Sequence, residues 1–279
     1  MTLKDRRRVK MIVLVALMLV LAIIYFYPVF LMVINSIKPF GEVVSSAIAL
    51  PKIFAFENYP IVLERMKYVQ LFFNTLIITI IGIAGIVFFS AITGYILHRR
   101  PGKYSNFARL FIITPMLIPF QTIMITLLKT MTVIGFTGSK IGLGIQYWGF
   151  GIPMAMFIYF NFMSTVPKEL DESAYIDGAS TFRIFGQIIF PLLQSVTATV
   201  IVLDVMWIWN DFLLPLLMVN RTNATKTLVL AAYSFVGQFN TQWQYAMTAM
   251  VMTVLPSIIF FIVLQKKIIA GVVAGAVKG

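Results

Sequence analysis

Long apolar stretches recur along this chain, and they constrain its fold more than any other feature of the sequence. A helix needs about 20 predominantly apolar residues to cross the hydrocarbon core of a bilayer. Six stretches are long and apolar enough, at residues 11–35, 69–97, 110–128, 141–163, 192–218 and 245–265. The sequence therefore predicts an all-α membrane protein with six transmembrane helices.

The composition agrees with an integral membrane protein and excludes several kinds of site. Of the 279 residues, 60% are hydrophobic and 11% are charged, whereas about 25% of residues are charged in soluble domains. Cysteine is absent, which excludes a disulfide, a thiolate nucleophile and a cysteine metal site. The one histidine, His98, adjoins Arg99 and Arg100 and is interpreted as part of a basic membrane flank, so we expect no metal site.

Residues 1–36 combine a basic leader with the first apolar stretch. This pattern imitates a secretory signal peptide. The apolar run is too long for one, however, and it lacks a small-residue cleavage site. We interpret residues 1–36 as a retained leader and first span.

The distribution of lysine and arginine predicts the orientation, because these residues accumulate in cytoplasmic loops. With the N-terminus inside, the inner segments carry 14 of the 22 lysines and arginines. Both termini, the tail at 266–279 and the segment 167–191 are then cytoplasmic, while the uncharged stretch 227–244 lies outside the bilayer or dips into it. This topology and anionic lipid account for the net charge of +12 without nucleic acid.

Residues 167–191 form a polar, acid-bearing island between the fourth and fifth apolar stretches. Pro167 suits the first turn of a helix, and Glu169, Asp171 and Glu172 place negative charge beside the positive end of the helix dipole. A short helix is expected over about 168–177. Gly178 can adopt the left-handed conformation that ends it, and Ser180 or Thr181 can cap a second helix. The island is predicted to be a helix-turn-helix elbow.

The two helices of the elbow are expected to face different surroundings. Phe182, Phe185 and Ile189 form an apolar stripe on the second helix that would lie against the membrane core, and Pro191 opens the next span. The first helix is left to face outward, exposing Glu172, Ser173 and Ala174. On residue types alone, an ordinary cytoplasmic loop with an acidic helix start explains the island equally well.

The spacing of residues in the island resembles a known motif. Glu172, Ala174, Asp177, Gly178, Ala179 and Pro191 match the E-A-A...G loop of the membrane subunits of ATP-binding-cassette importers, with Ser173 where that family usually has alanine. Further landmarks resemble those of the maltose-type sugar permeases: PKIFAFENY at 51–59, NTLIIT at 74–79, TGYILHRR at 93–100, WNDF at 209–212 and AGAVKG at 274–279. The similarity runs from residue 51 to the C-terminus.

This resemblance implies an assembly around a multi-pass subunit in a bacterial plasma (inner) membrane. The chain would be a single permease domain, 1–279, with its core at 69–265. Its partners would be a homologous second permease, two cytoplasmic ATPase subunits and an extracellular or periplasmic sugar-binding protein. Residues 167–191 would be the coupling loop, moved by the closing ATPase and passing that motion to the fifth span. The implied ATPase-coupling residues are Glu169, Glu172, Ser173, Ala174, Asp177, Gly178 and Ala179.

The fifth apolar stretch holds two carboxylates, Asp204 and Asp211. A charge at the bilayer centre costs about 2.5 to 3.5 kcal/mol on insertion scales, so such residues usually face a cavity or a partner. Seven residues are nearly two helical turns, which places both aspartates and Trp207 on one face. Carboxylates beside an indole ring suit a neutral sugar, and we expect a substrate path with Asp204, Trp207, Asn210 and Asp211. Trp207 as an interface anchor and Asp211 as a solvated side chain remain alternatives.

The sequence lacks the G-x-x-x-x-G-K-S/T loop that cradles phosphate, so ATP and Mg²⁺ are expected on the partner ATPase and no cofactor on this chain. An ion-coupled secondary transporter using Asp204 is the alternative function, although no inverted repeat is visible. An intramembrane enzyme would depend on Asp204 and Asp211. These lie about 10 Å apart along a helix, too far to share a proton. We therefore expect a transport subunit with no catalytic residues.

Overall fold

The computed structural model describes residues 3–236 and 241–276, and in those ranges the chain forms helices and loops with no strand. This confirms the predicted helical fold class. The chain divides into two compact units. One unit comprises Met1–Tyr68 with Ala232–Thr253, and the other comprises Val69–Ala231 with Val254–Gly279.

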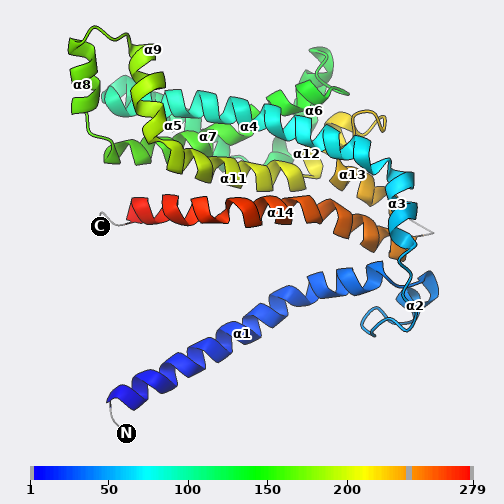
Figure 1. The fold of residues 1–279 in the computed structure, drawn as a ribbon. Helices are drawn as coiled ribbons and strands as arrows, with labels where there is room; N and C mark the ends of the chain where they lie inside the picture. The colour runs from blue at the N-terminus through cyan, green and yellow to red at the C-terminus, as the bar shows by residue number, and fades with distance from the viewer. Residues whose placement is uncertain (1–2, 237–240, 277–279) are drawn as a thin grey trace. The chain divides into compact units, whose positions relative to one another are not determined.

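The first unit contains a long helix that is apolar around its circumference. This helix is α1 (Leu3–Ser36), drawn in blue in Figure 1. Its side chains from Met11 to Phe30 are exposed. A helix that is hydrophobic on all sides suits the interior of a bilayer. Its apolar part, Lys10–Ser36, is long enough to cross a membrane and coincides with the predicted first span.

A buried lysine organises the segment that follows α1 in this unit. The Nζ atom of Lys38 donates to Oδ1 of Asn35 and to the carbonyl of Ser46, each at 3.0 Å. Asn58 Nδ2 donates to the carbonyls of Ser36 and Lys38 at 2.9 Å. Burial lowers the pKa of Lys38, and the nearby Glu42 carboxylate partly opposes that shift. These bonds connect the end of α1 to α2 (Phe40–Ser45) and to α3 (Asn58–Met66).

The second unit is built around α4 (Tyr68–Arg99) and α7 (Lys140–Phe162), which pack closely. The approach depends on glycine: a Cβ on Gly85 would lie 2.0 Å from the Trp148 ring, and one on Gly151 would lie 2.3 Å from Ile86. Small residues commonly allow this approach between membrane helices. Trp148 Nε1 donates to the Ile81 carbonyl at 2.8 Å.

Two of the expected spans are broken. The third, predicted at 110–128, consists of α5 (Lys103–Ile113), η1 (Thr114–Leu117) and α6 (Phe120–Val133), with a bend of 100°. Pro115 and Pro119 lie at the bend, where proline removes helical hydrogen bonds. By length and composition, the described residues therefore contain four unbroken helices able to cross a membrane, and up to six spans if each bent pair counts as one.

The fifth expected span, 192–218, is interrupted at both ends of α11 (Gln194–Asn210). Before it, the segment Thr181–Leu192 meets α11 at 76°. After it, Asp211 is extended, and its Oδ1 atom accepts from the backbone N–H of Leu213 at 3.2 Å. Asp211 thus separates α11 from α12 (Leu213–Val219), because a short polar side chain that bonds to nearby backbone donors competes with helical hydrogen bonds.

The end of the chain contains the sixth expected span. The described residues from 227 to 242 contain the short helices α13 (Leu228–Ala232) and η4 (Tyr233–Phe235), while 237–240 lie outside the described residues. α14 (Trp243–Ala276) contains the predicted span 245–265. The predicted tail at 266–279 continues this helix to Ala276, and 277–279 lie outside the described residues.

Candidate functional site: the helical elbow

The segment 167–191 folds as an elbow, with a turn at the predicted glycine. α8 (Glu169–Ile176) is followed by Gly178 at φ +80°, and Ser180 caps the next helix by accepting from the Arg183 N–H at 3.4 Å. Glycine adopts a positive φ without the steric cost of a Cβ. The predicted helix, turn and cap are therefore confirmed. Pro167 differs from the prediction, since it precedes the first helical turn instead of lying in it.

The second helix of the elbow is short and irregular. α9 (Thr181–Ile184) continues as a π-helical segment, η3 (Phe185–Ile189), and then as α10 (Phe190–Leu192). Ile189 is fully buried and Phe185 is half-buried, but Phe182 is 83% exposed. Phe182 and Phe185 line the same apolar hollow, and the position of the stripe against the membrane core stays a prediction.

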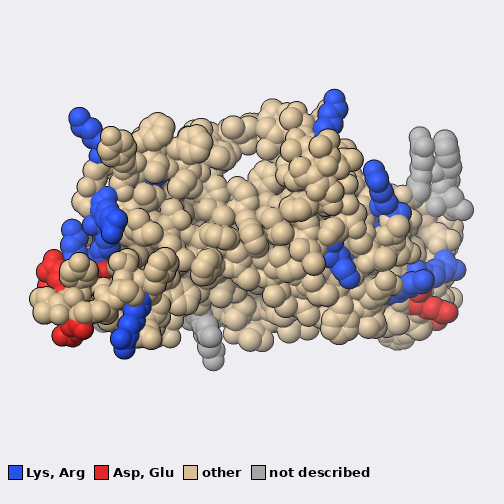
Figure 2. Space-filling model, turned by 90° about the horizontal axis from the view of Figure 1, so that it is seen from above, with Lys and Arg blue, Asp and Glu red and all other residues tan. Residues whose placement is uncertain are grey.

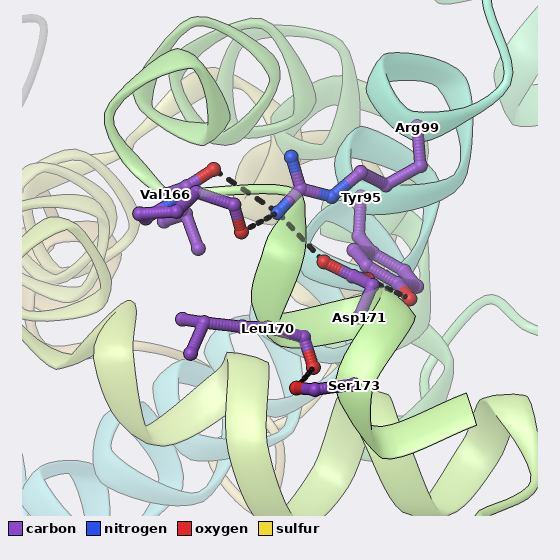
Figure 3. A network of polar contacts seen from close by, with 7 residues as sticks. Tyr95, Arg99, Val166, Leu170, Asp171 and Ser173 are labelled. Atoms are coloured by element: carbon purple, nitrogen blue, oxygen red, sulfur yellow. Dashed lines mark hydrogen bonds and ion pairs between the residues drawn. The ribbon is translucent and has the colours of Figure 1, made fainter. Parts of the chain in front are cut away.

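Asp171 fastens α8 to the end of α4. Its Oδ2 atom lies 2.8 Å from Arg99 Nη2, and its Oδ1 atom accepts from the Tyr95 hydroxyl at 2.6 Å. Arg99 Nη2 also donates to the carbonyls of Val166 and Pro167 at 3.1 Å (Figure 3). We call Tyr95, Arg99 and Asp171 the Asp171 clamp. Its charged side chains are 10% and 17% exposed, and charge-assisted bonds in such surroundings are strong.

The sequence did not reveal this clamp. Asp171 was interpreted as a helix-dipole charge and Arg99 as a topological charge, and the pair is separated by two apolar stretches. A basic residue at the end of one span and an acid in the next inner loop are the signals that could have suggested it. Neither specifies the partner, because the contact depends on how α4 and α8 pack.

The structure exposes most of the residues predicted to couple to an ATPase. Exposed side chains or backbone are found at Glu169, Glu172, Ser173, Asp177 and Gly178, and Ala179 is half-buried. Ala174 is 7% exposed, so the expectation that it faces outward is wrong. Residues three apart share a helix face, which turns Ala174 inward together with Asp171.

Two large residues of α8 that the sequence had not singled out are exposed. Tyr175 is 72% exposed and Ile176 is 84% exposed. Side chains of this size at the tip of an elbow are typical anchors of protein interfaces. Figure 2 shows acidic and basic side chains gathered at the end of the view where Figure 1 places α8 and α9.

A groove of about 530 Å³ lies between the end of α4, α8 and α9. It contains the Asp171 clamp and part of the predicted coupling surface. Its lining residues are Tyr95, Ile96, Arg99, Arg100, Lys168, Asp171, Glu172, Tyr175, Ile176, Thr181 and Ile184. We call this cavity the basic groove.

Two of the residues predicted for the substrate path share a hollow. Trp207 and Asp211 line this hollow of about 200 Å³ together with Gln121, Phe120, Phe150, Leu213 and Leu214. The Tyr147 hydroxyl donates to Asp211 Oδ2 at 2.8 Å, and its ring meets that of Trp207 edge-on at 5.3 Å. Tyr147 is a fully buried support for this hollow that the sequence analysis missed.

Asp204 and Asn210 lie apart from that hollow. Asp204 is 9% exposed, and its Oδ2 atom has no hydrogen-bond partner among the described residues. Asn210 is exposed and donates to the Met206 carbonyl at 2.8 Å. The expectation that Asp204, Trp207 and Asp211 lie on one face assumed that a single helix runs through all three. α11 ends at Asn210, so the extended backbone at Asp211 redirects its carboxylate.

Known proteins resemble this chain along most of its length. The family described as binding-protein-dependent transport system inner membrane component matches residues 86–273. The chain is 38% identical over 260 residues to the probable starch degradation products transport system permease protein AmyC of Thermoanaerobacterium thermosulfurigenes, covering 93% of this chain and 94% of that protein. It is 33% identical over 262 residues to the melibiose/raffinose/stachyose import permease protein MelC of Bacillus subtilis, at 93% and 94% coverage.

The fold has a counterpart among solved structures. A chain of a bacterial ABC transporter involved in the import of the acidic polysaccharide alginate superimposes with a TM-score of 0.81 at 21% identity, covering 95% of this chain and 98% of that one. The likeness confirms the arrangement of helices. With the family match and the apolar helices, it shows that this chain belongs to the binding-protein-dependent transport system inner membrane components and is a membrane transport subunit, not an enzyme.

Proposed function

We propose that the chain is the permease subunit of an ATP-driven importer for a sugar, in the oligosaccharide size range, delivered by an external binding protein. The observation that carries this proposal is the elbow, which exposes Glu172 and Ser173 while the Asp171 clamp holds it to a membrane helix. The relatives support the substrate class, since their names describe transport of starch degradation products and of melibiose, raffinose and stachyose.

The proposed assembly contains a homologous second permease, two cytoplasmic ATPase subunits and a periplasmic or extracellular binding protein. The absence of a phosphate-cradling loop from the sequence supports a separate ATPase that holds ATP and Mg²⁺. A further structure with this fold, at a TM-score of 0.67, is a bacterial alginate ABC transporter in complex with an alginate pentasaccharide-bound periplasmic protein.

The structure supports two routes by which a moving elbow would act on the membrane helices. The Asp171 clamp joins α8 to α4, so a displacement of α8 pulls on a helix 32 residues long. The second route runs through α9, η3 and α10 into α11, the helix that carries Trp207. The two membrane helices reached in this way, α4 and α11, both pack on α7. Tyr147 of α7 supports the hollow at Asp211. Closure of the ATPase would therefore change the exposure of that hollow.

The substrate path provides the test of function. In proteoliposomes that contain the complete transporter, we expect sugar uptake to need ATP, and Trp207→Ala and Asp211→Asn each to raise the apparent KM roughly five- to thirtyfold. Loss of an aromatic platform or a hydroxyl acceptor removes about 1 to 2 kcal/mol, which corresponds to that factor. ATP hydrolysis without sugar should stay normal.

Asn210→Ala is the matched control, because Asn210 adjoins Asp211 yet does not line the hollow. A KM equal to that of the control in both variants would refute the substrate path. Uptake that follows an ion gradient instead of ATP, and that Asp204→Asn abolishes, would replace the importer by the ion-coupled transporter.

The orientation has its own test, since the sequence contains no cysteine. Thr181 on the elbow and Asn223 in the loop after α12 are both exposed. In intact cells, an impermeant thiol reagent should label Asn223→Cys at least tenfold faster than Thr181→Cys, and cell lysis should remove the difference. Faster labelling at position 181 in intact cells would place the elbow outside and refute its contact with a cytoplasmic ATPase.

A further inference from the structure

The basic groove carries more positive charge than the Asp171 clamp uses. Arg100 and Lys168 line it, are exposed and make no ion pair within the described part of the chain. Arg99 is nine-tenths buried, and although its Nη2 atom is bonded, its Nε atom is buried without a hydrogen-bond partner among the described residues. Asp171 is neutralised by Arg99, which leaves Glu172 as the unpaired acid in the lining. The groove therefore offers an anion the hydrogen-bond donors of Arg100, Lys168 and Arg99 Nε.

The remaining wall of the groove is apolar. Ile96 and Ile184 lie beside the exposed side chains of Tyr175 and Ile176. If a small inorganic anion were bound, these apolar side chains would stay exposed to water. The lining suits a ligand that joins an anionic group to hydrocarbon.

A second, apolar hollow continues along the same helix. It has a volume of about 520 Å³ and lies on the other side of α9. Its lining includes Ala84, Phe88 and Ile92, which lie on one side of α4, and Ile96 of the basic groove lies one turn further along the same helix. From Ala84 to Ile96 the rise is about 18 Å, close to the roughly 15 Å depth of one leaflet's hydrocarbon.

We propose that the basic groove binds the phosphate headgroup of an anionic phospholipid of the cytoplasmic leaflet, with its acyl region against Ile96 and the apolar hollow beyond α9. Clusters of basic residues at the cytoplasmic ends of spans attract such headgroups. The bound lipid contacts both α4 and α8, and so stabilises the position of the elbow that the Asp171 clamp holds. This inference rests on the cytoplasmic elbow of the proposed function, which the cysteine labelling decides separately.

A lipid fits these observations better than a segment of the ATPase. The groove begins at Tyr95 and Ile96, in the last apolar turn of α4, and the second hollow lies deeper along that helix. A soluble partner would not follow α4 into the bilayer. A free phosphate would need neither the apolar wall nor the hollow.

Photo-crosslinking tests the proposal on the complete transporter in phosphatidylcholine nanodiscs that contain photoreactive phosphatidylglycerol. We expect crosslinks on the peptides of the α4 end and α8, and we expect Arg100→Gln with Lys168→Gln to reduce them about tenfold. The matched control is Lys10→Gln with Lys103→Gln, which removes the same charge from exposed sites outside the groove. That control, and the charge-preserving pair Arg100→Lys with Lys168→Arg, should retain the crosslinks.

Competition distinguishes the possible occupants. Unlabelled phosphatidylglycerol should displace the probe, whereas glycerol phosphate and inorganic phosphate at millimolar concentration should not. Equal crosslinking in the groove variant and the control would overturn the proposal. So would displacement by free phosphate, or crosslinks that appear only after the ATPase is stripped from the complex, since the groove would then hold a soluble anion or the ATPase itself.

Discussion

Replacing Gly178 by valine is expected to leave the chain in the membrane with its sister permease and to reduce transport to less than about a tenth. A Cβ at this position would meet no atom within 4 Å, so crowding is not the cause. The cause is the backbone φ of +80° at Gly178. A residue with a side chain adopts this left-handed conformation at a cost of about 1 to 2 kcal/mol in conformational free energy, and at a higher cost if the side chain is β-branched. The turn would relax and re-aim α8. The measurement is ATPase co-purification together with sugar-stimulated ATP hydrolysis.

Two substitutions show whether the conformation itself matters. Asparagine tolerates the left-handed region, so Gly178→Asn should keep most of the activity that Gly178→Val loses. Gly186 also has open space around it but no positive φ, and Gly186→Ala should behave like the wild type. Glu172→Lys, which reverses an exposed charge on the same helix, should release the ATPase without altering the turn. If Gly178→Val and Glu172→Lys both retain coupling, the elbow only connects two spans and has no role in coupling, and the proposed function fails.

Breaking the Asp171 clamp is expected to uncouple ATP hydrolysis from transport. Asp171→Asn removes the charge that compensates Arg99, and leaving one partner of a buried ion pair alone typically costs 3 to 5 kcal/mol. Tyr95→Phe removes one hydrogen bond to a carboxylate and should have a smaller effect, about 1.5 to 3 kcal/mol. The complex should assemble in both variants. The ratio of sugar transported to ATP hydrolysed should fall at least tenfold in Asp171→Asn and by less in Tyr95→Phe.

The exposed Glu64, in α3 and outside the elbow, provides the control. Glu64→Gln removes an acid that belongs to neither the clamp nor the predicted coupling surface, and this variant should transport normally. A charge swap, Asp171→Arg with Arg99→Asp, should recover part of the coupling that each single change loses, because coupled residues deviate from additivity. Equal transport ratios in Asp171→Asn and Glu64→Gln would show that the clamp fastens a loop and has no role in coupling.

Local chemistry let the sequence predict the elbow closely. The turn at Gly178 and the cap at Ser180 depend on the residue itself and its immediate neighbours, so both appeared at the expected positions. The apolar stretches likewise predicted the long helices α1, α4, α7 and α14, because a run of about 20 apolar residues has few ways to satisfy its backbone in a bilayer. The breaks in the third and fifth expected spans were not predicted, although Pro115 and Pro119 lie at one and Asp211 ends α11, because the size of each bend depends on packing.

The sequence by itself determined the membrane class, the helical segments and the position of the elbow, since hydropathy, helix capping and glycine conformation act over a few residues. The tertiary structure alone decided that Asp171 meets Arg99 and Tyr95, that Ala174 faces inward, and that Asp211 shares a hollow with Trp207 while Asp204 does not. Each of these depends on the angle and rotation at which one helix packs against another. Those quantities arise from the fit of many side chains across an interface, and no short stretch of sequence specifies them.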